Sequence, residues 1–145
     1  MDGDSLPVSA FVDCADGQFE LGASAYEKRG VAVVVPHWDE TKCIQCNQCA
    51  YVCPHATIRP FAMTEDEAAA APEATRTLDA MGPKAKGMKF TMAVSPLDCM
   101  GCTNCVKVCP KGALEMVPTE QELDQQPGWD YMVENVSEKK GLIAA

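Results

Sequence analysis

Two runs of cysteine with identical spacing give this chain its strongest chemical signal. Each run reads C-x2-C-x2-C-x3-C-P, the pattern with which proteins hold pairs of 4Fe–4S cubanes. The first run comprises Cys43, Cys46, Cys49 and Cys53, and the second comprises Cys99, Cys102, Cys105 and Cys109. The chemistry that this spacing predicts is one-electron transfer through iron–sulfur clusters.

The spacing also predicts which cysteine binds which cluster. Three thiolates set three residues apart on a tight loop can bind three iron corners of one cube. The fourth thiolate is carried onward by a short helical turn and must bind the other cube. The proline after each run ends that turn, because proline has no backbone N–H to donate. The expected ligand sets are Cys43, Cys46, Cys49 and Cys109 for the first cluster, and Cys99, Cys102, Cys105 and Cys53 for the second.

Structural zinc and disulfides are the alternative uses of so many cysteines. Zinc sites usually combine two C-x2-C pairs across a longer loop, which fits two runs of equally spaced cysteines poorly. Disulfides suit small secreted proteins, but the sequence opens on acidic residues without the basic start and apolar core of a signal peptide. Iron–sulfur clusters in a cytoplasmic protein are therefore the favoured interpretation.

Composition limits the expected partners. The 145 residues suffice for one ordinary domain, or for a small domain with an appendage. The longest apolar stretch, residues 31–35, is far shorter than the roughly 20 residues of a membrane span, so no membrane contact is expected. The formal net charge is −9, which makes nucleic acid an unexpected partner. An acidic surface suits docking to a basic face of another redox protein or domain, although acidity can equally serve only to keep a protein soluble.

The elements that must position the cysteines repeat along the chain. A shift of 56 positions, the difference between residue numbers 43 and 99, superimposes the two runs, so this part is an internal duplication. Each copy reads as a loop, a short helix and a strand. Alternating apolar residues predict a half-buried strand over residues 88–94 that pairs with 114–117, and in the first copy residues 31–35 pair with 58–63. The predicted fold class is α+β, with two small antiparallel hairpins and short helices around two cubane clusters.

Flanking and inserted segments complete the predicted organisation. In the insertion between the copies, Thr64 and Glu67 form a capping box, and residues 73–81 can form a second helix. We expect this insertion to cover the surface rather than to gate solvent or contact a neighbour. The predicted domains are a linker arm at 1–30, a two-cluster domain at 31–118 with a helical insertion at 64–87, and a C-terminal helix or linker towards a missing catalytic domain at 119–145.

The C-terminal segment carries its own helix signals. Thr119 and Glu122 have the spacing of another capping box. Residues 128–136 can form a helix whose apolar stripe includes Trp129 and Met132. Within this chain, that stripe is expected to lack a finished domain to cover.

Several residues outside the two runs are weaker candidates for a role. Cys14 has no partners at ligand spacing and is expected to be a small buried hydrophobe. His37 and His55 flank the first run and could donate hydrogen bonds to cluster sulfurs, but surface histidines are as common beside such motifs, so neither is a predicted site residue. Arg59 and Lys111 could offset cluster charge, although solvated side chains are the default. The residues expected to form a dry shell are Ile44, Tyr51, Val52, Ile58, Val106, Val108 and Leu114.

Beyond the cysteines, the chain resembles a known family. Three segments are similar to pyruvate:ferredoxin (flavodoxin) oxidoreductase: Glu27-Lys28-Arg29, Cys43-Ile44-Gln45-Cys46-Asn47-Gln48-Cys49 and Cys53-Pro54-His55-Ala56-Thr57-Ile58-Arg59-Pro60-Phe61. The similarity covers nearly the whole chain, as the family's EKR linker followed by its bacterial-type, two-cluster ferredoxin-like domain. The Glu-Lys-Arg segment joined to the stretch from Cys53 to Phe61 is more selective than the cluster motifs, which many ferredoxins share.

The resemblance implies a place in an anaerobic enzyme that cleaves a 2-oxo acid, typically pyruvate, with coenzyme A. The family's thiamine diphosphate and a third 4Fe–4S cluster lie in other domains, while the eight cysteines here take the ligand roles of two clusters that relay electrons to ferredoxin or flavodoxin. No catalytic motif is visible in this sequence. We therefore expect a non-catalytic electron-transfer fragment or subunit, partnered by the other domains of the parent oxidoreductase and by external ferredoxin or flavodoxin. The alternatives are a free-standing two-cluster ferredoxin and a structural zinc module.

Overall fold

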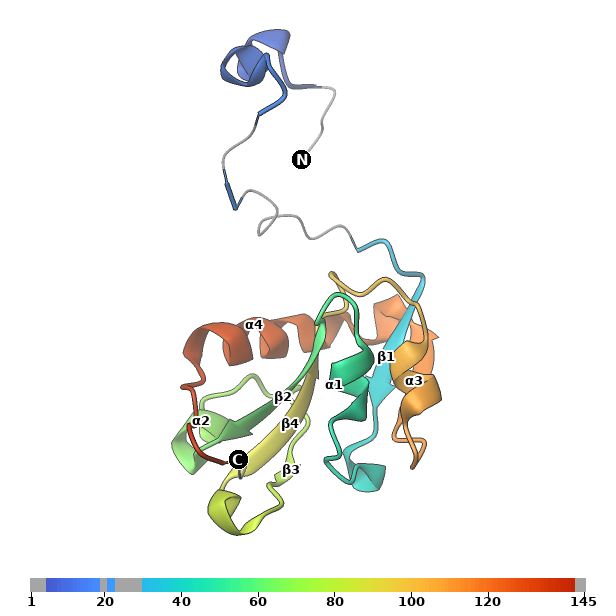
Figure 1. The fold of residues 1–145 in the computed structure, drawn as a ribbon, viewed down its shortest axis with the longest axis vertical. Helices are drawn as coiled ribbons and strands as arrows, with labels where there is room; N and C mark the ends of the chain where they lie inside the picture. Colours follow the sequence, from blue (N-terminus) through green and yellow to red (C-terminus); the bar gives the residue numbers. More distant parts are fainter. Residues whose placement is uncertain (1–4, 19–20, 23–29, 143–145) are drawn as a thin grey trace.

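The computed structural model describes residues 5–18, 21–22 and 30–142, and this part of the chain forms two antiparallel sheets (Figure 1). In one sheet, β1 (Val34–Trp38) pairs with β5 (Leu114–Pro118). In the other, β4 (Lys89–Val94) lies between β2 (Ile58–Met63) and the short β3 (Leu78–Asp79). Helices α1 (Gln48–Val52) and α3 (Asn104–Val108) contact each other, and α4 (Gln126–Asn135) packs on β4. The predicted α+β class is confirmed.

Strand pairing joins the two copies of the repeat. The prediction that each copy forms its own hairpin is wrong, because β1 of the first copy pairs with β5 of the second, and β4 of the second pairs with β2 of the first. The two sheets have the same register under the 56-residue shift: Val34 faces Pro118 as Phe90 faces Ala62. The cysteine loop and helix separate the two strands of one copy, so pairing within a copy has little of the entropic advantage of a tight hairpin. The copies are thus related by an approximate twofold axis.

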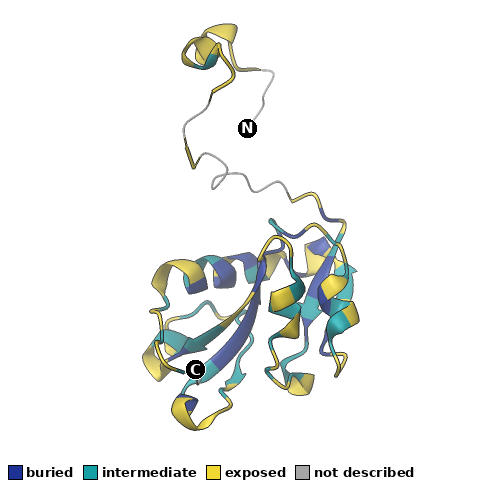
Figure 2. Cartoon of the chain, viewed as in Figure 1, coloured by how far each residue is buried: buried dark blue, intermediate teal, exposed yellow. Residues whose placement is uncertain are grey.

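Strand β4 is buried on both faces, not on one as predicted. One face packs into the core that contains the cysteines through Phe90 and Met92. The other face is covered by α4, whose Trp129 and Met132 are buried in a second apolar cluster. Figure 2 shows this division, with buried residues along β4 and exposed residues on the outer side of α4. The C-terminal helix is therefore confirmed, and the expectation that its apolar stripe has nothing to cover is wrong.

The insertion starts as predicted and then departs from the prediction. Helix α2 (Glu65–Ala69) opens with the expected capping box: the Thr64 hydroxyl accepts from the Glu67 N–H (3.2 Å), and the Glu67 carboxylate accepts from the Thr64 N–H (2.8 Å). The predicted helix over residues 73–81 is replaced by a turn and then by β3. Leu78 of β3 packs against the cysteine-containing core. Tertiary packing thus overrides the weak local helix propensity.

Glu122 forms a buried ion-pair cluster instead of the predicted second capping box. Its carboxylate accepts hydrogen bonds from Arg76 Nη1 (2.8 Å) and Nη2 (3.1 Å) and lies 2.6 Å from His37 Nδ1. Glu122 is only 3% exposed, and a buried carboxylate requires such partners because its desolvation is costly. The cluster joins β1, the insertion and the C-terminal segment.

The described segment nearest the N-terminus packs little against anything else. There, Val8–Cys14 forms a 3-10 helix without a buried residue. Cys14 is only half-buried there, so the expected burial is wrong. The Glu27-Lys28-Arg29 segment lies outside the described residues, and the division of the chain into domains stays a prediction. Within the described ranges, every helix is too short or too polar to cross a lipid bilayer.

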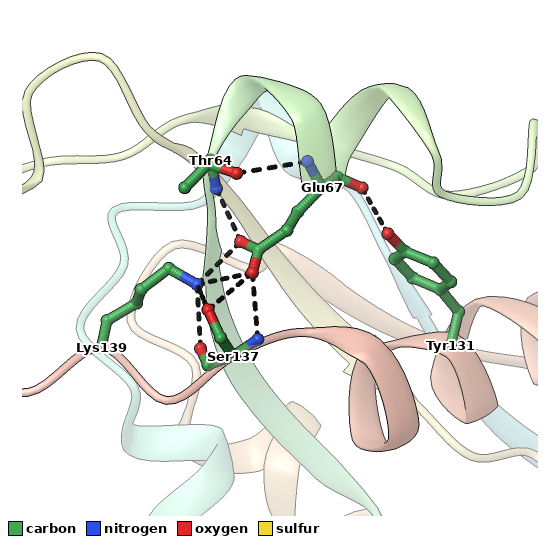
Figure 3. Close-up of polar contacts among 5 residues, drawn as sticks. All are labelled: Thr64, Glu67, Tyr131, Ser137 and Lys139. Carbon is green, nitrogen blue, oxygen red and sulfur yellow. Dashed lines mark hydrogen bonds and ion pairs between the residues drawn. The ribbon is translucent and has the colours of Figure 1, made fainter.

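The Glu67 carboxylate also joins the insertion to the C-terminal segment (Figure 3). It accepts hydrogen bonds from the Ser137 backbone N–H (3.0 Å) and hydroxyl (2.7 Å) and pairs with Lys139 Nζ (2.7 Å). The Tyr131 hydroxyl donates to the Glu67 carbonyl oxygen (2.8 Å). Partial burial alone would raise the pKa of Glu67, but the bonds from Lys139, Ser137 and Thr64 outweigh it and hold the pKa well below its usual range.

Glu67→Gln is expected to loosen the C-terminal segment. Because the folded-state pKa is depressed, the stabilisation by the carboxylate is complete above its ordinary pKa of 4.5 and declines as the pH falls below that value. At pH 7 the Ser137 amide should exchange with solvent about tenfold faster in the variant, and the difference from wild type should shrink below pH 4.5. Hydrogen exchange followed by mass spectrometry measures both effects. Asp66→Asn, at an exposed position on the same helix, is the control, and equal exchange in all three proteins would contradict the assignment.

Candidate metal centres

Among the described residues, two cavities each bring together four cysteines, three from one run and one from the other. The first-run cavity is lined by Cys43, Cys46, Cys49 and Cys109. The second-run cavity is lined by Cys99, Cys102, Cys105 and Cys53. In the same described part, no three His, Cys, Asp or Glu side chains are arranged to hold a single metal ion. The four cysteines of each set instead line a shared cavity.

Left-handed backbone residues shape both cysteine loops in the same way. Gln45 and Asn47 have φ values of 54° and 59°, and their equivalents Gly101 and Thr103 both have a φ of 67°. At Gly101 a Cβ atom would lie 3.0 Å from the Val34 carbonyl oxygen, so both the backbone conformation and the close approach favour glycine. These bends curl each loop around its cavity before the short helix begins. Non-glycine residues in this region are uncommon and are typical of functional loops.

Backbone N–H groups point at the cysteine sulfurs in a symmetric pattern. The donor and acceptor pairs are Gln45 N–H to Cys43 Sγ (3.4 Å), Gly101 N–H to Cys99 Sγ (3.4 Å), Thr57 N–H to Cys53 Sγ (3.4 Å) and Ala113 N–H to Cys109 Sγ (3.2 Å). One difference breaks the symmetry: the Thr57 hydroxyl lies 3.5 Å from Cys53 Sγ, whereas Ala113 has no hydroxyl. Hydrogen bonds of this kind stabilise a thiolate.

Burial changes the acidity of the cysteines. It raises the pKa of Cys49 to about 12 and that of Cys105 to about 11, and it also raises the pKa of Cys99. Burial alone would also raise the pKa of Cys53, but hydrogen bonds from Thr57 outweigh this effect and lower that pKa. A thiol with a raised pKa is protonated at neutral pH, so a thiolate at Cys49 or Cys105 requires a nearby cation. Four sulfur donors around one cavity therefore fit a 4Fe–4S cluster.

The walls of both cavities are largely apolar, as the predicted dry shell requires. Ile58 lines the second-run cavity and Leu114 the first-run cavity, and both are buried. Tyr51 and Ile44 are 85% and 42% exposed, so the prediction is wrong for Tyr51, and Ile44 forms only part of an outer wall. Among the wall residues that sequence reasoning missed, four lie on strands: Pro36, Trp38, Met92 and Met116. Their alternate positions on the strands are the signal that could have found them, once the pairing is known.

The histidines and basic residues near the two cysteine runs lie in different parts of the structure. His37 contacts Glu122 rather than a cysteine, while His55 lines the second-run cavity. Its equivalent, Lys111, lines the first-run cavity. The Arg59 guanidinium stacks over the Trp129 ring at 5.3 Å from the ring centre, where it covers α4 rather than either set of cysteines.

Comparison with known proteins identifies the class. Residues 42–113 match the family described as the 4Fe-4S dicluster domain, and residues 1–32 match EKR, a domain of unknown function. The match assigns residues 42–113 to the 4Fe–4S dicluster domain and supports iron–sulfur chemistry and electron transport as the class of this chain.

Individual relatives indicate a narrower class of protein than the family model does, and they confirm the resemblance found in the sequence. The chain is 54% identical over 121 residues to pyruvate:ferredoxin oxidoreductase of Moorella thermoacetica, covering 82% of this chain and 10% of the relative. It is 50% identical over 131 residues to pyruvate-flavodoxin oxidoreductase of Klebsiella pneumoniae, covering 89% and 11%. It is 52% identical over 132 residues to pyruvate-flavodoxin oxidoreductase of Enterobacter agglomerans, covering 90% and 11%. The chain thus corresponds to a small segment of these much longer oxidoreductases.

Proposed function

We propose that this chain relays low-potential electrons, one at a time, through two 4Fe–4S clusters. The donor is the thiamine-diphosphate centre of a 2-oxo-acid oxidoreductase that acts on pyruvate, and the acceptor is ferredoxin or flavodoxin. The single observation that carries the proposal is the composition of each cavity, with three cysteines from one run and the fourth from the other. Cubane clusters held by these cysteines would supply one-electron transfer.

The chain's own residues would then have three tasks. The eight cysteines act as ligands in the two sets that line the cavities. The backbone N–H groups directed at four of the sulfurs hold those thiolates in place and stabilise their charge. The apolar walls exclude water, which influences reduction potential. Both cavities border one apolar core, in which Ile58 and Leu114 pack with cysteines of both runs, so the two sites are adjacent.

The parent enzyme and the partners belong to the same proposal. The names of these two relatives include ferredoxin and flavodoxin, which supports these two proteins as acceptors. Thiamine diphosphate and a third cluster would lie in other domains of the parent, and the chain would work as a non-catalytic segment of that enzyme. An anaerobic cytoplasm is the setting that we propose, with no nucleic-acid or membrane partner.

Anaerobic reconstitution with iron and sulfide tests the proposal. We expect a brown protein with about eight iron atoms per chain, which after chemical reduction delivers about two electrons to ferredoxin or flavodoxin. A colourless protein, or one that takes up zinc in preference, would contradict it. To separate a relay from a free-standing ferredoxin, the loaded chain is mixed with the thiamine-binding part of the oxidoreductase, pyruvate and coenzyme A. Stable association with this partner and reduction of the chain support the relay, whereas equal reduction by unrelated enzymes without association supports the free carrier.

A further inference from the structure

The insertion makes the two halves of the molecule unequal. Under the twofold relation, β1 and β4 are equivalent strands, as are β2 and β5. Strand β3 is additional: it pairs with β4 through Leu78 opposite Phe90 and Asp79 opposite Lys89. The sheet of β1 and β5 has two strands in the described residues. The extra strand lies in the insertion, so the insertion adds backbone and side chains to one half alone.

The side-chain amide of Gln45 binds the insertion with both of its polar groups, at the end of β3 and two residues beyond it. Gln45 Nε2 donates to the Asp79 carbonyl oxygen (2.8 Å), and Gln45 Oε1 accepts from the Met81 backbone N–H (2.8 Å). The backbone N–H of the same residue donates to Cys43 Sγ (3.4 Å). Gln45 therefore connects the insertion directly to the cysteine loop of the first-run cavity.

The equivalent position in the second copy shows that the backbone alone does not require glutamine. Gly101 occupies that position with the same left-handed conformation, and its N–H makes the same bond, to Cys99 Sγ. Glycine adopts this conformation without steric cost, whereas a residue with a Cβ atom does not. Gln45 thus holds an unfavourable conformation for which its two amide hydrogen bonds are the compensating contacts.

The insertion strand also reaches the core around the cysteines. Leu78 and Ala80 pack against the buried apolar cluster that contains Trp38 and Met92, two residues that line the first-run cavity. The side-chain contact between this strand and β4, from Asp79 to Lys89, joins side chains that are 87% and 42% exposed, and such surface pairs contribute little to stability. The bonds of Gln45 are therefore the main polar link between the strand and the first-run loop.

We propose that Gln45 is a positioning residue that clamps the insertion over the loop of the first-run cavity, so that the insertion controls solvent access to one cluster and not to the other. This inference rests on the proposed function, because it concerns a cluster in that cavity. With the clamp closed, Leu78 and Ala80 cover the buried cluster whose Trp38 and Met92 form part of the wall of the first-run cavity. When the clamp opens, water reaches the first-run site alone, so the reduction potentials of the two otherwise similar clusters become different.

Gln45→Gly in the reconstituted chain tests the clamp, because it copies Gly101 and removes the amide without straining the backbone. The Met81 amide is expected to exchange with solvent about tenfold faster than in wild type. A redox titration followed by EPR is expected to show a shift in the potential of one cluster, with the other potential unchanged and the iron content retained. Gln48→Ala is the matched control, since Gln48 is an exposed glutamine of the same segment, and it should change neither quantity.

The outcomes separate this inference from the proposed function. Gln45→Gly with full iron and two unshifted potentials would overturn the clamp alone, as would equal shifts of both potentials. Shifts of the same size in Gln48→Ala would also overturn it. A wild-type chain that takes up no iron would overturn the proposed function and, with it, this inference.

Discussion

Cys53→Ala is expected to abolish the cluster of the second run, although Cys53 belongs to the first. The structure places Cys53 at the cavity of Cys99, Cys102 and Cys105, and a cubane needs one thiolate for each of its four irons. Iron content should fall from about eight to about four atoms per chain. Chemical analysis measures the iron, and EPR of the reduced protein should retain the signal of one cluster.

Paired substitutions show which cluster is lost. Cys53→Ala combined with Cys102→Ala should lose no more iron than either change alone, because both cysteines line one cavity. Cys53→Ala combined with Cys46→Ala should lose both clusters, since Cys46 lines the other cavity. Cys14→Ala is the control and should leave the iron content unchanged. If the pair with Cys46 lost no more iron than the single variants, the crossed assignment would be wrong.

Removal of iron by an anaerobic chelator is expected to unfold residues 31–117. Cysteines from both runs pack in the same core as Trp38, Ile58 and Leu114, so empty sites would leave this core without much of its interior. Metal binding and folding are coupled in small domains of this kind. Circular dichroism should show loss of the strand signal, and return of iron and sulfide under anaerobic conditions should restore it.

The second apolar cluster gives this experiment an internal comparison. Met63, Ala93, Trp129 and Met132 pack together without a cysteine, but Met63 and Ala93 lie on the strands that also border the first core. Because β2 and β4 contribute to both clusters, we expect both to be lost together. Strand signals and slow amide exchange that persist in the iron-free protein would contradict the prediction.

The sequence alone indicates iron–sulfur chemistry, because the cysteine spacing that is typical of it is a local pattern. The positions of Cys43 and Cys99 within their runs, and the short helix after each, follow from a few consecutive residues. The strands at 58–63 and 89–94 also have a local signal, namely the alternation of apolar residues. These features did not require knowledge of which segments meet in space.

Features that depend on distant contacts could not be predicted in this way. Apolar alternation predicts a strand but does not show which other strand pairs with it, so the pairing of β1 with β5 was missed. Residues 73–81 have helix-compatible composition, yet β4 offers an open edge that Leu78 joins. Glu122 has the spacing of a capping residue, but Arg76 and His37 approach it from other segments. In each case a partner remote in sequence decided the outcome.

The exchange of strands between copies has a consequence for the origin of the fold. A single copy, taken by itself, would expose unpaired strand edges and hold three sulfurs where four are needed. Two identical copies placed about the twofold axis would satisfy the pairings of β1 with β5 and of β2 with β4, because the registers of these two pairs are equivalent. A peptide of half this length would therefore have to associate as a symmetric homodimer to make the same pairings. Because residues 64–87 join the two copies in one chain, their association is intramolecular and does not depend on protein concentration.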